Sequence, residues 1–120
     1  MLCKEFTERA VYYRAFGQVV AQGLDMDVHS TATSLRDLWA KLSHNIVANM
    51  LMAEECGYII PRAPQICWDA FGLGFRIKHI RPETVRFNDS DFTVRPNVRF
   101  YHHPNLLTNA PPMAYPQFHT

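Results

Sequence analysis

The chain of 120 residues is poor in cysteine and glycine, with three of the former and five of the latter. The cysteines, Cys3, Cys56 and Cys67, are widely spaced and odd in number, which argues against a disulfide framework and favours a reducing, cytoplasmic setting. The first ten residues carry four charged side chains, so we expect no secretory signal there. The uncharged stretch 42–53 contains a histidine and two asparagines, so we expect no transmembrane segment.

The sequence also lacks the motifs of common catalytic and cofactor sites. It contains no C-x-x-C, no H-E-x-x-H and no G-x-S-x-G, and Gly72 and Gly74 lack the third glycine of a dinucleotide-binding turn. A zinc site or a Cys67–His dyad would require His79 or His102 to converge with cysteine in the fold, and both stay open as alternatives. We therefore expect no metal and no cofactor, and an enzymatic role ranks third among the functional classes.

The clearest pattern in the chain predicts a long helix over residues 35–56. Apolar side chains recur there at steps of three or four residues, which places them on one stripe of an α-helix. Ser34 is a suitable N-cap residue with Asp37 three positions on, and Gly57 suits the left-handed residue that ends a helix. We expect the rest of the domain to be built against this helix.

Two further helices are expected on either side of it. Residues 4–22 carry apolar side chains at helical spacing, and Gly23 is a natural stop. Gly17 inside that segment predicts a close crossing of the long helix. Pro64 suits the first turn of a short helix over residues 64–71.

From residue 75 onward the period of the pattern changes to two. Alternating apolar and polar side chains predict a small antiparallel sheet over residues 75–101, with a turn at residues 88–91. Pro82 and Pro96 must lie at turns or on an edge, because proline cannot donate to the hydrogen-bond ladder. The predicted fold class is therefore α+β: two long N-terminal helices and a short third helix packed on one face of a small antiparallel sheet.

The last part of the sequence differs in composition from the rest. Residues 104–120 hold four prolines and no charged side chain, which predicts an extended, proline-rich tail. We expect residues 1–103 to form a single domain. No internal repeat and no second domain is visible.

Charge is unevenly divided along the chain. The formal charge of residues 1–56 is −2 and that of residues 57–120 is +3. Basic side chains on one strand face could hold phosphates while neighbouring aromatic rings stack on bases. The alternative is an ordinary solvated face with the aromatic rings turned to the core. The candidate nucleic-acid-binding residues are Arg76, Lys78, Arg86, Arg95 and Arg99.

Protein interaction is the other functional class that the sequence favours. Proline-rich extended segments dock into aromatic grooves, and apolar helices can complete their core across a two-fold axis, which would give a homodimer. The candidate partner-binding residues are Met50, Met52, Met113, Tyr115 and Phe118. We therefore expect a small cytoplasmic adaptor or inhibitor that occupies a surface of another protein. A regulatory protein that binds nucleic acid through a basic strand face is the alternative.

Overall fold

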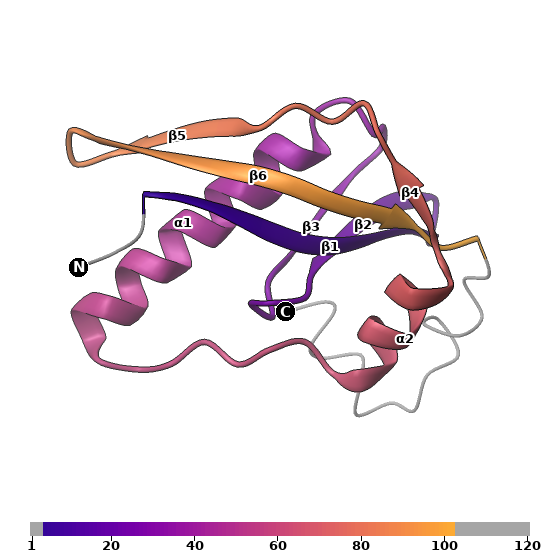
Figure 1. Ribbon diagram of the computed structural model, residues 1–120, viewed down its shortest axis with the longest axis horizontal. Coiled ribbons are helices and arrows are strands. Elements are labelled where there is room, and N and C mark those ends of the chain that lie inside the picture. The colour runs from indigo at the N-terminus through magenta and orange to yellow at the C-terminus, as the bar shows by residue number, and fades with distance from the viewer. Residues whose placement is uncertain (1–3, 103–120) are drawn as a thin grey trace.

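The computed structural model describes residues 4–102, which form a six-stranded mixed sheet and two helices (Figure 1). The helices are α1 (Leu38–Cys56) and α2 (Gln65–Leu73). The strands are β1 (Glu5–Ala15), β2 (Gln18–Gly23), β3 (His29–Ala32), β4 (Phe75–Ile77), β5 (Glu83–Phe87) and β6 (Ser90–Phe100). The α+β class is confirmed, but the predicted arrangement of its elements is wrong. The predicted tail, residues 104–120, lies outside the described part of the chain.

The sheet joins strands from both ends of the described chain. Its order is β3-β2-β1-β6-β4, and β5 also pairs with β6. The central pair, β1 and β6, runs parallel, whereas all the other pairs are antiparallel. The predicted antiparallel sheet over residues 75–101 is therefore only part of a larger, mixed one.

The first predicted helix does not form, because residues 4–22 fold into β1 and β2. β1 is a central strand, and its residues Ala10, Val11, Tyr12 and Tyr13 are all buried, alternately on the two faces of the sheet. A strand that is buried on both faces shows no polar alternation, so its apolar residues can imitate helical spacing. Gly17 consequently lies in a tight turn instead of at a helix crossing.

The long helix is confirmed over most of its predicted length. α1 begins three residues later than predicted, and Asp37 takes the N-cap position that the sequence suggested for Ser34, without a side-chain capping bond. Gly57 ends the helix with a φ of 77°, and its N–H donates to Ala53 O, as the pattern indicated. The short helix α2 is also confirmed. No helix within residues 4–102 is long and apolar enough to cross a membrane.

The two helices cover opposite faces of the sheet, so the prediction that all helices cover one face is wrong. α1 packs its buried side chains, Leu38, Trp39, Leu42, Ile46 and Val47, against one face. α2 packs Cys67 and Ala70 against the other face, over the carboxyl half of β1. Figure 1 shows that α2 is short and lies at one end of the sheet. The remaining part of the α2 side of the sheet is therefore left without a covering helix.

Pro96 explains why β4 and β5 are two strands instead of one. Along β6, Thr93 and Tyr101 donate their N–H groups towards β1, so the even-numbered nitrogens point to the opposite side. On that side β6 pairs with β5 up to Val94 and with β4 from Val98 onward. The Pro96 nitrogen, which has no hydrogen to donate, faces the gap between them. The prediction that Pro96 lies at a turn or on an edge is therefore wrong, because Pro96 lies inside β6, which is paired on both sides. It is tolerated there because its nitrogen faces the gap in the ladder.

Phe16 is an aromatic residue in a backbone conformation that favours glycine or asparagine. Phe16 and Gly17, with φ of 53° and 76°, form the two-residue turn between β1 and β2. The Phe16 side chain is 78% exposed. Because a bulky residue at positive φ is strained, we expect Phe16→Asn to raise the free energy of unfolding by about 1 kcal/mol, measured by urea denaturation.

Gly17→Ala supplies the matched control for this prediction. A Cβ at residue 17 would meet no atom within 4 Å, so alanine there adds backbone strain without a clash. We expect Gly17→Ala to lower the stability by a similar amount. If Phe16→Asn lowers the stability as well, contacts of the Phe16 ring outweigh the strain and the prediction is wrong.

Candidate functional site

The part of the sheet that α2 leaves uncovered is a polar surface rich in arginine, which we call the open face. In the register of the sheet its residues lie opposite one another in pairs, such as Thr7 with Arg95, Arg76 with Arg99 and Arg86 with Asp91. It carries five arginines against two acidic residues, and none of its side chains is fully buried. The open face consists of Glu5, Thr7, Arg9, Arg76, Thr84, Arg86, Asp91, Thr93, Arg95, Asn97 and Arg99.

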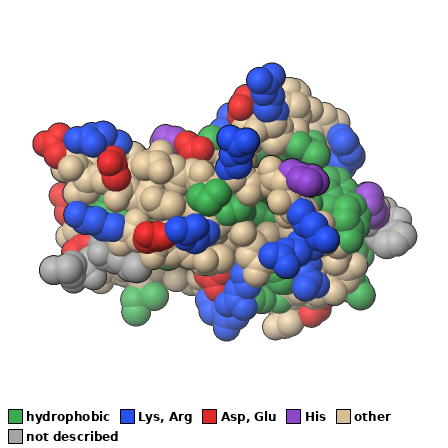
Figure 2. Space-filling view, turned by 45° about the horizontal axis from the view of Figure 1, so that its top comes forward, with side chains coloured by type: hydrophobic (Ala, Val, Ile, Leu, Met, Phe, Trp, Pro, Cys, Tyr) green, Lys and Arg blue, Asp and Glu red, His purple; other side chains and the backbone are tan. Residues whose placement is uncertain are grey.

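Three of the five candidate nucleic-acid-binding residues meet in one hollow of this face. The hollow measures about 670 Å³ and lies at the gap beside Pro96, where the connection from β4 to β5 passes. Arg76, Lys78 and Arg95 line it together with Asn97. In the view of Figure 2, Lys and Arg side chains gather on this side of the molecule beside exposed hydrophobic groups and a histidine.

The positive groups in this hollow differ in how firmly they are paired. Arg95 forms an ion pair with Glu5, which lies on the adjacent strand β1. Within residues 4–102, neither Arg76 nor Lys78 forms an ion pair. Two exposed cations in a concave site therefore have no compensating acid, which gives the hollow a net positive charge.

The other two candidate residues lie at opposite ends of the open face. Arg86 lies near the β5–β6 turn, where it pairs with Asp91 at 3.2 Å and with Asp89 at 3.9 Å. Arg99 lies beside α2, where its guanidinium carbon is 4.8 Å from the centre of the Phe71 ring and its Nη1 donates to Phe71 O at 3.3 Å. The structure therefore brings together three of the five residues and separates the other two from them.

The aromatic residues of the strands do not lie among these arginines. Phe75, Phe100 and His102 stack against one another on the α1 side of the sheet, and Tyr101 is buried under α2. Alternation of side chains therefore separates strand aromatics from strand arginines, as the solvated-face alternative required. The rings that do border the open face, Trp68 and Phe71, come from α2.

Arg9 belongs to the open face and Trp68 borders it, and sequence reasoning missed both. Arg9 was placed on a helix, and only the parallel pairing of β1 with β6 puts it opposite Asn97. Its guanidinium carbon lies 4.6 Å from the centre of the Trp68 ring. No local sequence signal indicated this contact, because it joins segments that are 59 residues apart.

A buried carboxyl group holds Arg9 and the β2–β3 loop in place. Glu8 is 1% exposed, and its Oε2 accepts hydrogen bonds from the backbone N–H groups of Asp25 at 3.1 Å and Met26 at 3.3 Å. Asp25 in turn accepts from the Arg9 backbone N–H at 3.0 Å and from its Nη2 at 2.5 Å. Burial opposes the ionisation of Asp25, but these bonds from Arg9 outweigh it and lower the pKa of Asp25.

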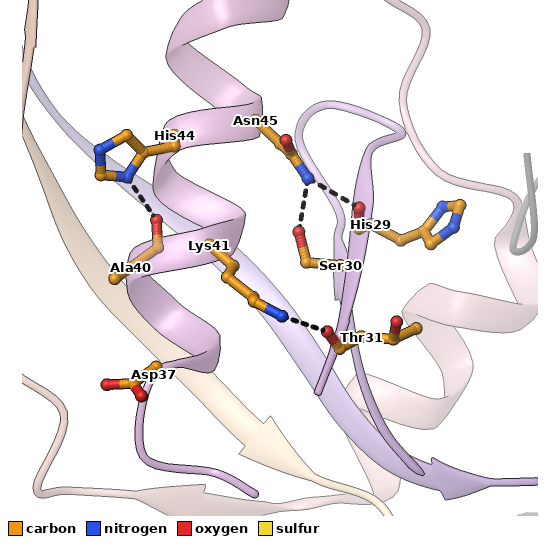
Figure 3. A pocket seen from close by; sticks show the side chains of 8 residues that line it. All are labelled: His29, Ser30, Thr31, Asp37, Ala40, Lys41, His44 and Asn45. Carbon is orange, nitrogen blue, oxygen red and sulfur yellow. Dashed lines mark hydrogen bonds between the residues drawn. The ribbon is translucent and has the colours of Figure 1, made fainter. Parts of the chain in front are cut away.

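A second polar hollow, of about 690 Å³, lies between β3 and α1 (Figure 3). Its side chains already hold the edge of the sheet: Lys41 Nζ donates to Thr31 O at 3.2 Å, and Asn45 Nδ2 donates to His29 O at 3.2 Å and to Ser30 Oγ at 2.5 Å. Figure 3 shows the imidazoles of His29 and His44 pointing away from each other. This hollow therefore protects an edge strand, and its histidines do not converge on a common reaction centre.

An apolar hollow of about 460 Å³ lies on the α1 side, beside β4. It is lined mainly by Leu35, Phe75, Ile77 and Phe100, and the first two are 44% and 50% exposed. Leu35 contributes to this surface because α1 begins after it.

The candidate partner-binding residues lie elsewhere or outside the described residues. Met50 packs against the core on α1, whereas Met52 is 55% exposed. Met113, Tyr115 and Phe118 fall outside residues 4–102. The adaptor or inhibitor role therefore stays a prediction.

Metal and thiol chemistry find little support in the part of the chain that the structure describes. No group of three or more His, Cys, Asp or Glu side chains there could hold a metal ion. Cys67 lies on α2 and is buried against the sheet, and burial, with the nearby Asp27 charge, raises the pKa of its thiol. The protonated thiol is a poor nucleophile, so a Cys67–His dyad is not supported.

Glu8 makes the stability of the protein dependent on pH. Burial, with the charge of Asp25 as a further cause, raises the pKa of Glu8 from 4.5 to about 8. The folded protein thus retains a proton that the unfolded chain releases near pH 4.5, so the contribution of Glu8 to stability is fully present below that pH and is lost as pH rises to about 8. At 1.36 kcal/mol per pKa unit, the loss is about 5 kcal/mol at most.

We expect Glu8→Gln, which keeps the shape and removes the ionisation, to flatten this decline in urea denaturation between pH 5 and pH 9. Glu5→Gln, on the same strand but exposed, is the matched control and should leave the pH dependence unchanged. Equal slopes for wild type and Glu8→Gln would contradict the prediction.

The open face brings Arg76, Lys78 and Arg95 together in one hollow, and of these three only Arg95 forms an ion pair within residues 4–102. Its charge and geometry are the basis on which a function can be inferred. Comparison of the chain with protein-family models, with curated proteins and with solved structures found no match.

Proposed function

We propose that this protein binds nucleic acid through the open face, with the hollow beside Pro96 as its centre. The observation that carries the proposal is the meeting of Arg76, Lys78 and Arg95 in that hollow, where the first two have no acidic partner in the described chain. Phosphate groups of a nucleic acid backbone are the common ligands of such a cationic surface. A cytoplasmic location, which we expect from the cysteine content, is also part of this proposal.

The ion pairs of the open face do not oppose phosphate binding. Arg95 pairs with Glu5, and Arg86 pairs with Asp91, and all four side chains are more than half exposed. An exposed ion pair stabilises a protein by only about 0–1 kcal/mol, so a phosphate can replace the carboxylate as the partner of the guanidinium. Arginine binds phosphate through two parallel hydrogen bonds, which compensates for the loss of the original pair.

The polar residues between the arginines suit contacts to a sugar–phosphate backbone. Thr7, Thr93 and Asn97 supply neutral hydrogen-bonding groups on the same face. Such contacts fix the position of a nucleic acid but carry little information about its base sequence. We therefore expect binding with weak sequence preference and strong dependence on salt.

Fluorescence anisotropy with labelled oligonucleotides at graded NaCl concentrations tests this proposal. If the three cations of the hollow contact phosphates, the slope of log K against log[salt] should be about −2 for a single strand. The double variant Arg76→Ala, Lys78→Ala should reduce the slope to about −1 and weaken binding at low salt.

Arg36→Ala is the matched control for these variants. Arg36 is an exposed arginine beside α1, on the opposite side of the sheet from the open face. It should leave both the affinity and the slope unchanged. Absence of salt-dependent binding to single- and double-stranded probes, or an equal loss in Arg36→Ala, would refute the proposal.

A second candidate function, protein interaction, is favoured by the apolar hollow beside β4. We propose a second copy of this chain as the occupant, as the homodimer expected from the sequence would require. Leu35 and Phe75 expose about half of their surface in this hollow. Contact between the hollows of two copies across a two-fold axis would remove the exposed surface of Leu35 and Phe75 from water.

Sedimentation velocity over a range of protein concentrations tests the homodimer. We expect the wild type to shift from monomer to dimer as concentration rises, and Phe75→Asp to remain monomeric, because a charge at the contact is not tolerated. Ile59→Asp, in the segment between α1 and α2 where residue 59 is 91% exposed, is the control and should dimerise normally. A wild type that is monomeric throughout would exclude this occupant.

A further inference from the structure

Two arginine side chains lie over the ring of Trp68, and they differ in how they are held. The guanidinium carbons of Arg9 and Arg62 are 4.6 Å and 4.3 Å from the centre of the ring. Arg9 is fixed by its bonds to Asp25, which accepts from both the backbone and the side chain of Arg9. Arg62 is exposed and forms no ion pair within residues 4–102. Arg62 therefore lies closer to the ring than Arg9, but fewer bonds hold its side chain in that position.

The Trp68 ring is accessible from the Arg62 side. Cys67 and Ala70 direct α2 onto the sheet, which leaves Trp68 on the flank of the helix, where it is only partly buried. A hollow of about 270 Å³, lined by Arg62, Ala63, Gln65 and Trp68, opens beside the ring. A flat ligand can therefore reach the ring if the Arg62 side chain moves.

The relative strength of the contacts favours replacement of the Arg62 guanidinium by a nucleobase on the Trp68 ring. An exposed guanidinium over an aromatic ring contributes roughly two- to fivefold in affinity terms. A nucleobase stacked on an aromatic side chain contributes roughly fivefold to 150-fold. The displaced guanidinium of Arg62 is then available to a phosphate of the same ligand.

The Trp68 site is continuous with the open face through Arg9. Arg9 lies opposite Asn97 in the β1–β6 pair, and Asn97 lines the hollow that holds Arg76, Lys78 and Arg95. Thr7 and Arg9 point to the same face of β1, about 7 Å apart along the strand. A backbone bound in the hollow can therefore extend past Arg9 towards the Trp68 ring.

We propose that Trp68, backed by Arg9, is a stacking site for one unpaired nucleobase, so that the ligand of the open face is single-stranded nucleic acid. This proposal rests on the nucleic-acid binding proposed above and specifies its ligand. A base within a duplex is stacked on its neighbours and cannot lie on the ring, whereas a single strand presents its bases freely.

Tryptophan fluorescence tests the stacking, because the chain holds only one other tryptophan. Trp39 is buried between α1 and the other face of the sheet, where its Nε1 donates to Val94 O at 3.2 Å. Its fluorescence therefore supplies a constant background signal. The probes are oligothymidylate and an abasic oligonucleotide of the same length, which has the same phosphates but no bases. We expect quenching of the wild type by oligothymidylate and little quenching by the abasic strand.

Affinity measurements on variants separate stacking from charge. Trp68→Leu, which keeps an apolar side chain at this position of α2, should weaken binding of oligothymidylate about fivefold or more and change binding of the abasic strand less than twofold. Phe71→Leu is the matched control, because the Phe71 ring is covered by Arg99, which also donates to Phe71 O. It should retain the wild-type discrimination between the two probes. Thermal unfolding verifies that both variants fold.

The possible results distinguish the two proposals. Salt-dependent binding with equal affinity for both single strands and no quenching would overturn the stacking site and leave the phosphate-binding face intact. Tighter binding of a duplex than of oligothymidylate would also overturn it. Failure of every probe to bind would refute the proposed function, and the stacking site with it. Base-dependent quenching that Trp68→Leu abolishes and Phe71→Leu retains would support the stacking site.

Discussion

The parallel pairing of β1 with β6 is the interaction on which the other features of this structure depend. It joins the two ends of the described chain, with Thr93 N–H donating to Lys4 O and Tyr101 N–H donating to Tyr12 O. A parallel pair needs a crossover connection, and here both helices lie within it, one on each face of the sheet. The two hydrophobic cores therefore share β1, because successive buried residues of this strand pack into one core and then the other. Loss of this pair would remove both cores together.

The same pairing produces the candidate interface. It brings Thr7 and Arg9 of β1 onto the same face as Arg95 and Asn97 of β6. On the other side of β6, Pro96 interrupts the ladder and separates β4 from β5, which leaves a hollow where the connecting segment passes. One proline without a donor thus shapes the site in which the unpaired cations meet. Its effect depends on its position in a strand that is paired on both sides.

The limited size of α2 decides how far the interface extends. With nine residues it covers only the carboxyl half of β1, so the amino half of that face remains in contact with solvent. At the border, Trp68 and Phe71 lie against arginines that come from the sheet or from the preceding segment. Charged and aromatic groups therefore meet along the flank of α2 and not along the strands, where alternation separates them.

The sequence by itself determined the features that depend on near neighbours. The apolar period of 3.6 residues and Gly57 predicted α1, and Pro64 predicted the start of α2. The alternating residues after residue 75 predicted the region of β4, β5 and β6, with a turn at Asn88 and Asp89 between the last two strands. It also indicated five basic residues on one strand face, of which the structure brings three, Arg76, Lys78 and Arg95, together in one hollow. Only the tertiary structure decided that residues 4–22 are strands, because burial on both faces removes the alternation by which a strand is recognised. It alone decided the partners of Arg9 and Trp68, because pairing between distant segments depends on the packing of the whole sheet and leaves no local pattern.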